Sequence, residues 1–175
     1  MFNRKSLTPS RTVFLLLAWW VFLFFVSTIN AAYAEPVILG KVVGISDGDT
    51  LTLLDEDKQQ HRIRLAGIDA PERAQPYGEA SRRNLSELAY GRLVAADCPK
   101  VDRYKRLVCV VRVDGSDVSL AQIKAGLAWH YKKYANEQSP DDREAYSNAE
   151  IEVRMDGRGL WAETAPLPPW EWRHR

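Results

Sequence analysis

Alternating and β-branched positions near the start of the chain predict three consecutive β-strands, over residues 36–45, 50–54 and 61–66. The polar run Ser-Asp-Gly-Asp at residues 46–49 is a typical turn between the first two strands. In the third strand, Ile63 and Leu65 face one side, whereas Arg62 and Arg64 face the other. Together the three segments predict an antiparallel meander.

After this meander the pattern changes to the period of helices. Helices are predicted over residues 76–88, from Ser119 to about residue 127 and from Ser139 to about residue 155, and two further strands over residues 93–96 and 107–113. The residues from Ser119 to Gln122 match a capping box, and Ser139 followed by Pro140 is a typical helix N-terminus. The polar segment from Pro99 to Arg106 is predicted to be the hairpin loop between the last two strands.

Five strands with a helix inserted before the fourth indicate an α+β fold that is mainly β. We expect a five-stranded Greek-key barrel of the OB type with three packed α-helices, formed by residues 35–165. The Pro- and Trp-rich tail, residues 166–175, is expected to lie along the surface. Barrels of this type bind oligonucleotides or oligosaccharides without necessarily catalysing a reaction, so the fold alone does not decide the function.

The first 34 residues have the composition of an export signal. Three basic residues among the first twelve precede a 14-residue apolar run from Val13 to Val26, and an A-x-A cleavage pattern follows at Ala32 to Ala34. We expect cleavage after Ala34 and a periplasmic or extracellular protein. The alternative is an uncut anchor in the inner membrane, which the two adjacent tryptophans favour, although a spanning helix needs about 20 apolar residues.

Composition and charge narrow the functions further. The chain of 175 residues is 46% hydrophobic and 27% charged, which is typical of a globular domain and not of a disordered chain. The first 34 residues hold three of the 24 basic residues and none of the 23 acidic ones, so the remainder carries a net charge of −2. A strongly basic, non-specific nucleic-acid binder is therefore disfavoured, and contact with nucleic acid requires a local basic cluster.

Three carboxylates are expected to meet at one end of the meander. Asp49 belongs to the Asp-Gly-Asp-Thr turn between the first two strands, and Asp69 and Glu72 belong to Asp-Ala-Pro-Glu just past the third strand. Neighbouring carboxylates repel each other unless a cation or arginines compensate, and Ca²⁺ binds oxygen ligands of this kind. Taken singly, each of the two motifs is better explained as an ordinary turn.

Two arginines change this interpretation. Arg64 lies on the strand that leads to Asp69, and Arg106 follows the loop from Asp102 to Lys105. Guanidinium groups bind phosphate through two N–H groups and stay charged at all relevant pH values, although either arginine alone is better explained as a solvated surface charge. With the carboxylates they form a workable phosphodiester-cleaving site. A metal ion would orient water, a carboxylate would take its proton, and the arginines would stabilise the developing charge.

The motifs DGDT, RLAGIDAPE and DRYKRLV, in this order and at these spacings, resemble the staphylococcal nuclease (thermonuclease) family. The resemblance covers residues 37–161 and includes the segment AQIKAGLAWHY and the turn from Gly159 to Trp161. It implies an OB-fold barrel with packed helices and a Ca²⁺-dependent nuclease that acts on DNA and RNA. It also implies that the P–O5′ bond breaks and that 3′-phosphate products form.

Carried over position by position, the resemblance implies a role for each motif residue. It assigns Asp49 and Asp69 as carboxylate ligands of calcium, Ala70 as a backbone carbonyl ligand, Glu72 as the general base, and Arg64 and Arg106 as catalytic, phosphate-binding arginines. Tyr104 matches a tyrosine of the nucleotide pocket, and Tyr134 matches another through a looser alignment. Lys105 departs from the family, in which glycine is frequent at this position.

The two cysteines lie in the last two predicted strands. A pairing of Cys98 with Cys109 centres a hairpin between residues 103 and 104, in the middle of the polar loop, so the cysteines would face each other across the strands. Because exported proteins can keep disulfides, we favour a bridge that braces this loop. The alternative is a pair of buried free thiols.

Two functions compete with the nuclease. The first is a non-catalytic nucleic-acid-binding module of the cell envelope, but such a module would be free to lose a carboxylate or arginine, and all of them are present. The second is an envelope protein that binds another polymer or a protein partner, for which the acidic net charge leaves room. The nuclease interpretation predicts DNA and RNA as substrates, a monomer, no obligate protein partner, and membrane contact only through an uncleaved N-terminal segment.

Overall fold

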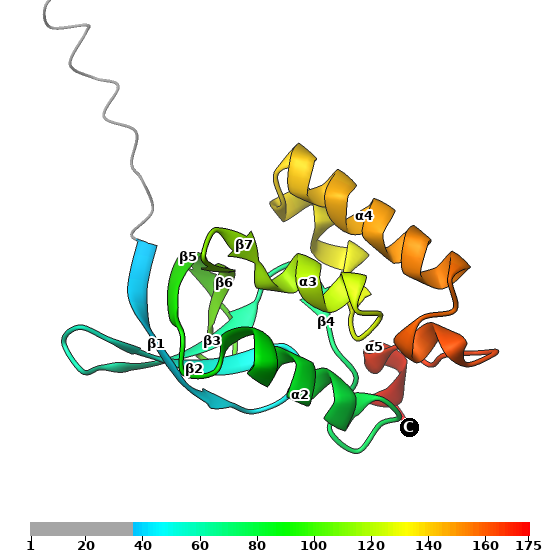
Figure 1. Cartoon of the computed structure of the whole chain (residues 1–175), viewed down its shortest axis with the longest axis horizontal. Coiled ribbons are helices and arrows are strands. Elements are labelled where there is room, and N and C mark those ends of the chain that lie inside the picture. Colours follow the sequence, from blue (N-terminus) through cyan, green and yellow to red (C-terminus); the bar gives the residue numbers. More distant parts are fainter. Residues whose placement is uncertain (1–36) are drawn as a thin grey trace, which may run out of the picture. The chain divides into compact units, whose positions relative to one another are not determined.

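A closed barrel of five β-strands forms the centre of residues 37–175, which are the residues that the computed structural model describes (Figure 1). Its strands are β1 (Val37–Ile45), β2 (Thr50–Asp55), β3 (Gln60–Leu65), β5 (Leu93–Val101) and β6 (Leu107–Val113). They follow the order β3-β2-β1-β5-β6, and a parallel pairing of β3 with β6 closes the barrel. The meander and the five-stranded OB-type barrel are therefore confirmed. The predicted export signal, residues 1–34, lies outside the described residues.

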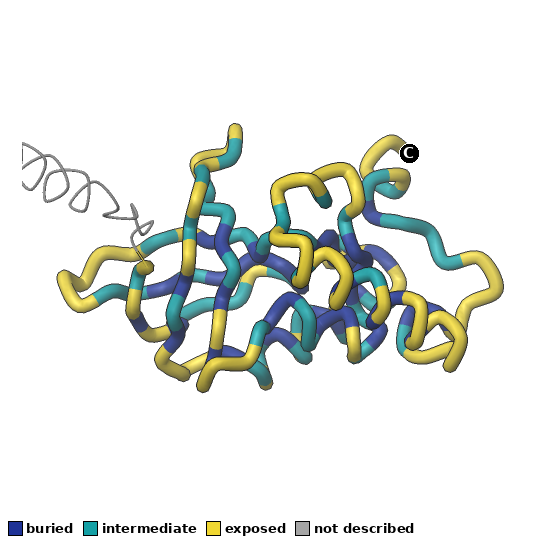
Figure 2. Tube along the Cα trace, turned by 90° about the horizontal axis from the view of Figure 1, so that it is seen from above, coloured by how far each residue is buried: buried dark blue, intermediate teal, exposed yellow. Residues whose placement is uncertain are grey.

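The barrel interior is filled by the inward-facing side of each strand. Leu51 and Leu53 in β2, and Ile63 and Leu65 in β3, are all exposed by no more than 1%. Figure 2 shows how buried positions gather in the middle of the barrel, while the tip of the β2–β3 hairpin is exposed. Each such side chain contributes about 1.5–3 kcal/mol when it is removed from water, so the alternation seen in the sequence holds the barrel together.

Helices and short strands cover one side of the barrel. The helices are α2 (Gly78–Ala89), α3 (Val118–Lys124), α4 (Pro140–Met155) and the short α5 (Pro169–Trp172), with the 3₁₀ turns η1 (Lys132–Glu137) and η2 (Gly159–Ala162). The two-residue strand β7 (Ser116–Asp117) pairs with β6. The strands β4 (Ile68–Asp69) and β8 (Trp129–His130) form a separate sheet. The three longer helices confirm the prediction, and α3 lies between α2 and α4 (Figure 1). Within residues 37–175, no helix has the length and apolarity that a membrane span requires.

Two predicted boundaries are wrong. Residues from Pro99 to Val101 belong to β5, because the strand continues past an irregularity between Asp97 and Lys100, and the polar loop is correspondingly shorter. The N-cap of α3 is Asp117, whose carboxylate accepts the N–H of Leu120 at 3.1 Å. An aspartate at this position caps the helix directly, so Ser119 and Gln122 do not form a capping box and are instead buried.

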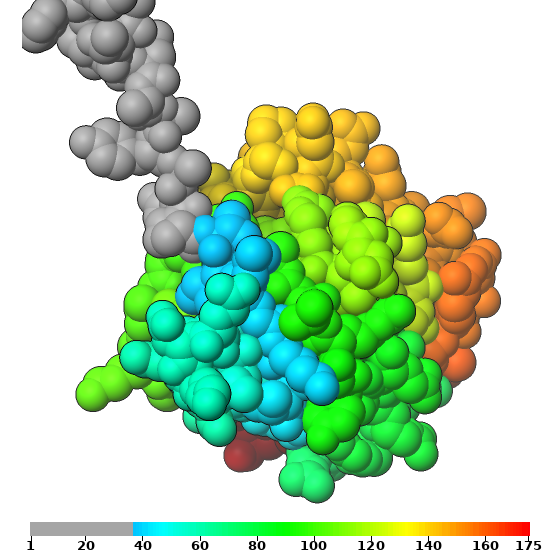
Figure 3. Space-filling model, turned by 60° about the vertical axis from the view of Figure 1, so that its left-hand side comes forward, coloured from blue at the N-terminus to red at the C-terminus, as the bar shows by residue number. Residues whose placement is uncertain are grey.

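The C-terminal tail does not simply follow the surface. Figure 1 shows α5 beside β4, close to the start of α2. On the face made by β1, the β2–β3 hairpin and α2, the red C-terminal residues are seen only at the lower edge (Figure 3). The tail therefore ends at the side of the barrel where β4 begins, which is also where the predicted site residues gather.

Candidate active site

The turn between β1 and β2 brings two aspartates to the rim of the barrel. The N–H of Asp49 donates to Oδ1 of Asp47 at 3.1 Å. Between them, a Cβ added to Gly48 would lie 1.9 Å from Oγ of Ser81 and 2.8 Å from Cβ of Ala70. Only glycine fits in this space, so the turn that carries Asp47 and Asp49 packs closely against Ser81 and Ala70.

Arg64 joins the carboxylates of Asp49 and Asp69. Its Nη1 donates to Oδ2 of Asp49 at 2.8 Å, and its Nη2 donates to Oδ1 of Asp69 at 2.8 Å and to the carbonyl of Ile68 at 3.2 Å. The N–H of Ala70 also donates to Oδ2 of Asp49, at 3.1 Å. The side chains of Arg64, Asp49 and Asp69 are only 15%, 6% and 0% exposed, so the ion pairs are largely shielded from water.

Burial and neighbouring charges shift the pKa values of the groups in this cluster. Burial opposes the charge of Arg64, but attraction to Asp49 and Asp69 outweighs it and raises the pKa of Arg64 above its ordinary value. Burial and repulsion from Asp49 raise the pKa of Asp69, although the arginines act in the opposite direction. The same two causes raise the pKa of Asp47 to about 6. Burial is the larger cause of both raised carboxyl pKa values, and repulsion between the carboxylates adds to it.

Arg106 reaches the cluster from the β5–β6 loop. Asp102 accepts its backbone N–H at 2.9 Å and its Nε at 2.8 Å. Burial opposes ionisation of Asp102, but these hydrogen bonds prevail and lower its pKa. Nη1 of Arg106 donates to Oγ1 of Thr50 at 3.2 Å, and this hydroxyl donates to Asp49 at 3.0 Å. Lys105 has a φ of 62°, the left-handed conformation that glycine adopts most readily, so a lysine here occupies a position for which glycine is the better steric fit.

Glu72 lies in the loop after β4, on the open side of the cluster. Its N–H donates to Oε1 of Gln75 at 3.1 Å, and a Cβ added to Gly78 would lie 2.0 Å from its carbonyl oxygen, so the start of α2 packs closely against it. Its carboxylate accepts from Nη1 of Arg173 at 2.6 Å. Nη2 of Arg173 also donates to Oδ2 of Asp69 at 2.6 Å. The third arginine at this site therefore comes from the C-terminal tail.

A single chain of hydrogen bonds joins the five residues that sequence reasoning selected as carboxylate ligands, base and arginines. It runs through Arg106, Thr50, Asp49, Arg64, Asp69, Arg173 and Glu72. Asp49, Glu72 and the three arginines line one broad cleft, whereas Asp69 lies beneath them. The arrangement combines groups that bind a phosphate, hold a cation and accept a proton, which are the requirements for phosphodiester cleavage.

Comparison with protein families also points to a phosphodiester-cleaving protein. The family described as "Staphylococcal nuclease homologue" matches residues 62–163, which include most of the residues of this hydrogen-bonded chain. The chain belongs to the staphylococcal nuclease family. The resemblance to this family and the OB-type fold that it implies are thereby confirmed.

Named relatives of this nuclease domain support the same activity. The chain is 36% identical over 175 residues to an "Uncharacterized endonuclease" of Haemophilus influenzae, with 100% of this chain and 88% of the relative covered. It is 38% identical over 143 residues to a "Micrococcal nuclease" of Shigella flexneri, with 77% of this chain and 79% of the relative covered. These relatives support a nuclease function, that is, a hydrolase acting on nucleic acids.

The donor set of the nuclease site fits a hard divalent cation, although no described cluster of three or more His, Cys, Asp or Glu side chains has metal-binding geometry. Asp47, Asp49 and Asp69 offer carboxylate oxygens, which are the ligands that a hard divalent cation prefers. Ala70 contacts Asp49 through its N–H, and the role of its carbonyl as a ligand stays a prediction.

The two predicted substrate-binding tyrosines both line the cleft. Tyr104 is 62% exposed, and the guanidinium carbon of Arg106 lies 5.4 Å from its ring centroid. Tyr134 is 42% exposed, and Nζ of Lys100 lies 4.7 Å from its ring centroid. Both rings have an accessible surface beside a positive charge, which suits a nucleotide base and its phosphate.

The predicted disulfide is present. Cys98 in β5 is bonded to Cys109 in β6, and no other cysteine occurs in the described residues. The bridge closes the hairpin whose loop carries Tyr104 and Arg106. It therefore fixes the strands on both sides of a predicted substrate-binding loop.

Sequence reasoning missed Arg173 and Gln122. The first lies in a tail that composition marks only as Pro- and Trp-rich. The second was assigned to a capping box, although a fully buried glutamine on a helix must find hydrogen-bond partners inside the protein. The position of Gln122 in an otherwise apolar helical stripe was the available signal, whereas no local pattern pointed to Arg173.

Proposed function

We propose that the protein is an exported nuclease that uses Ca²⁺ to hydrolyse phosphodiester bonds of DNA and RNA. The observation that carries this proposal is the continuous chain of hydrogen bonds from Arg106 to Glu72, which lines a broad cleft. The relatives named as nucleases support the reaction class. The N-terminal composition supports export.

In this proposal Asp49 and Asp69 would hold the cation, and the carbonyl of Ala70 would be a third ligand. A bound Ca²⁺ ion would supply positive charge to a phosphate oxygen. Nη1 and Nη2 of Arg64 both donate hydrogen bonds to carboxylates in the structure. Arg64 becomes available to a phosphate once another cation balances Asp49 and Asp69, and Arg106 needs only to exchange its contact with Thr50.

Glu72 acts as the general base. Its carboxylate is 39% exposed at the cleft, so a water molecule can approach it. Glu72 takes a proton from this water, the water oxygen bonds to phosphorus, and the P–O5′ bond breaks. The departing O5′ takes up a proton from solvent, which leaves a 5′-hydroxyl and a 3′-phosphate. Arg64 and Arg106 stabilise the charge that develops on the phosphoryl oxygens.

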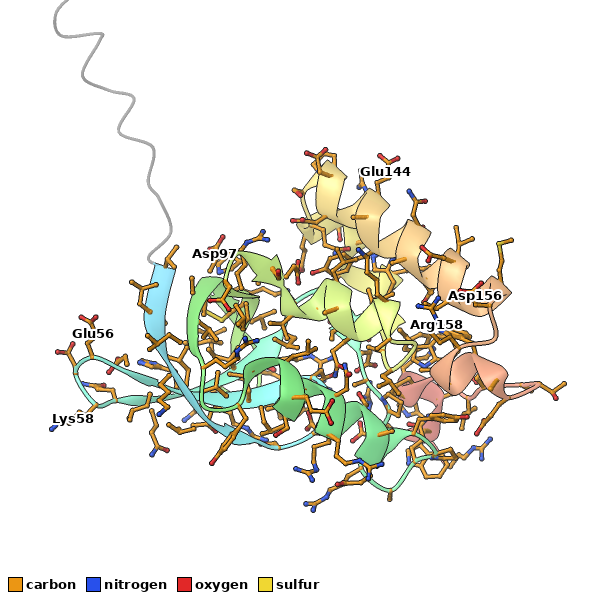
Figure 4. All side chains as sticks on the ribbon, viewed as in Figure 1. Glu56, Lys58, Asp97, Glu144, Asp156 and Arg158 are labelled. Carbon is orange, nitrogen blue, oxygen red and sulfur yellow. A yellow bond between two sulfur atoms is a disulfide. The ribbon has the colours of Figure 1, made fainter. Side chains whose placement is uncertain are left out.

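The test is cleavage of single-stranded DNA and RNA by the full chain, expressed in an oxidising compartment, with Ca²⁺ and with a chelator. Glu72→Gln should lower turnover about 10²- to 10⁴-fold, because proton abstraction by a positioned base contributes this much. Glu56→Gln is the matched control, since Glu56 is exposed at the tip of the β2–β3 hairpin, away from α5 (Figure 4).

The outcomes separate the alternatives. Calcium-dependent cleavage that Glu72→Gln loses and Glu56→Gln keeps supports the proposal. A folded protein that binds DNA but cleaves neither substrate, with Mg²⁺ and Mn²⁺ also tried, would instead identify a non-catalytic binding module. N-terminal sequencing of the exported protein tests the remaining part, since cleavage after Ala34 gives a chain that starts at Glu35.

A further inference from the structure

The C-terminal segment, residues 166–175, is fastened to the site at several points. Nε2 of Gln75 donates to the carbonyl of Leu167 at 2.6 Å. The ring of Trp170 stacks on Tyr131 with centroids 5.5 Å apart and meets Trp129 edge to face at 5.6 Å. Trp129 is also the residue that pairs with Asp69 between β8 and β4. The tail therefore packs against β8, the strand that pairs with the one carrying Asp69.

The packing of the tail places the Arg173 side chain beside the carboxylates of Asp69 and Glu72. The N–H of Arg173 donates to the carbonyl of Pro169 at 3.1 Å, which places the side chain one turn beyond the anchored part of α5. Its two Nη atoms then contact Asp69 and Glu72 at 2.6 Å each. Burial opposes the charge of Arg173, but its two carboxylate partners raise its pKa above the ordinary value. Arg173 is therefore a counter-ion shared by Asp69 and Glu72.

Asp69 is enclosed as a result. Arg64 donates to its Oδ1 at 2.8 Å, and Arg173 donates to its Oδ2 at 2.6 Å and, more weakly, to Oδ1 at 3.4 Å. The carboxylate is 0% exposed. The Arg173 side chain above it is 40% exposed. Oδ2 is thus covered by a group that solvent can reach, whereas Oδ1 is held by the more deeply buried Arg64.

We propose that Arg173 determines the metal affinity of this site, because a divalent cation can bind Asp69 only after it displaces the Arg173 guanidinium. This inference rests on the proposed function in one respect, since it takes Asp69 as the carboxylate that meets the cation. The guanidinium and the cation carry like charges and compete for the same oxygen. Metal binding and the position of the tail are therefore coupled, and each weakens the other.

The competition is effective because Arg173 is tethered. Its anchors at Leu167 and Trp170 hold the guanidinium beside Asp69, so it acts at a high effective concentration and not as a free ion from solution. Exposure of the side chain to water limits the strength of the contact. We therefore expect loss of the guanidinium to tighten cation binding about tenfold, which corresponds to ~1.4 kcal/mol.

The experiment is a calorimetric titration of the full chain with CaCl₂ alone, at fixed ionic strength, for the parent and for Arg173→Met, Arg173→Gln and Arg175→Met. Arg175→Met is the matched control, because Arg175 lies two residues further along the same exposed end and its guanidinium contacts the Trp172 ring at 5.8 Å. Both Arg173 variants should bind Ca²⁺ about tenfold more tightly, whereas the control should match the parent.

A second readout follows the tail itself. In the parent, the indole N–H signal of Trp170, assigned through its loss in Trp170→Phe, should shift as Ca²⁺ is added, because the displaced guanidinium is three residues away. In Arg173→Met the same addition should leave this signal in place. A merely structural role for Arg173 predicts equal or weaker Ca²⁺ binding in the variants, and that result would overturn the proposal.

Cleavage measured in parallel separates this inference from the proposed function. Tighter binding in the Arg173 variants without cleavage in any protein would support the competition and refute the nuclease. Cleavage by the parent with unchanged Ca²⁺ affinity in the variants would support the nuclease and refute the competition. If neither the parent nor the variants bind Ca²⁺, the competition is refuted, since there is then no cation for Arg173 to exclude.

Discussion

Gln122 on α3 donates a hydrogen bond of 2.6 Å to the carbonyl oxygen of Gly48. The same Nε2 also donates to the carbonyl of Ser81 on α2 at 3.1 Å, and Oε1 accepts from the side-chain amide of Asn84. Gly48 lies between Asp47 and Asp49, so a fully buried side chain of a helix holds the turn that carries two of the site's carboxylates. The helical layer therefore positions the site as well as covering the barrel.

Replacing this glutamine should loosen both the fold and the turn. In Gln122→Leu the carbonyls of Gly48 and Ser81 lose a buried donor, and each buried unsatisfied polar group costs about 1–3 kcal/mol. The free energy of unfolding, measured by urea denaturation, should fall by at least about 1 kcal/mol. Gln59→Leu, at an exposed position of the β2–β3 hairpin, is the control and should change stability by less than about 0.5 kcal/mol. Equal losses in the two variants would contradict the structural role of Gln122.

Arg64→Lys tests the bridge between the two aspartates. A lysine keeps the charge, but its single ammonium group cannot reproduce the planar guanidinium, whose Nη1 and Nη2 donate to Asp49 and Asp69. A buried carboxylate left without its partner should lower the free energy of unfolding by roughly 1–3 kcal/mol, and turnover should fall with it. Arg62→Lys, exposed on the same strand, should retain its stability. Denaturant titrations of the two variants test this prediction, and an equal free energy of unfolding in both would contradict it.

The disulfide should stabilise the hairpin that carries Arg106. Cys98 and Cys109 are 11 residues apart, and a loop of this size corresponds to a stabilisation of about 2–3 kcal/mol in the chain-entropy treatment. Reduction of the native protein, or the double change Cys98→Ser and Cys109→Ser, should lower the urea midpoint accordingly. A reducing agent added to the double variant is the control and should have no further effect. An unchanged midpoint on reduction of the parent would refute this role.

Local chemistry explains which parts of the fold could be predicted. Ile63 and Leu65 alternate with polar neighbours, and this period alone placed β3 and its buried face. Ser139 followed by Pro140 marked the start of α4 correctly, because the hydroxyl of Ser139 accepts the N–H of Asp142 at 3.1 Å. At α3 the predicted capping residue, Ser119, was wrong, and the structure shows that Asp117 caps the helix.

Long-range contacts explain what could not be predicted. The contact between Arg173 and Asp69 joins residues 104 positions apart, and it depends on how Trp170 stacks on Tyr131. No periodicity or turn pattern reports such a pairing, since it arises from the packing of side chains after the chain has folded. The extension of β5 to Val101 was missed for a related reason, because exposed strand positions tolerate the same polar residues as a loop.

His130 should make the stability of the domain depend on pH. Its Nε2 is 2.7 Å from Oε1 of Gln138 and donates to this oxygen in the neutral form, while the buried Nδ1 has no partner among the described residues. Burial, together with the charge of Lys132, therefore lowers the pKa of His130 below 6.5 and outweighs the opposing effects of Gln138 and Glu150.

The sign of the effect follows from the lowered pKa of His130. The unfolded chain binds a proton near pH 6.5 and the folded protein only at lower pH, so the stabilisation is fully present above pH 6.5 and is lost as the pH falls through the folded-state pKa. In this range the free energy of unfolding should fall by up to ~1.4 kcal/mol per pH unit because of this single group. His130→Gln removes the titrating ring, so its stability should decline less steeply than that of the parent in urea titrations between pH 7 and pH 5, and parallel pH profiles would contradict the prediction.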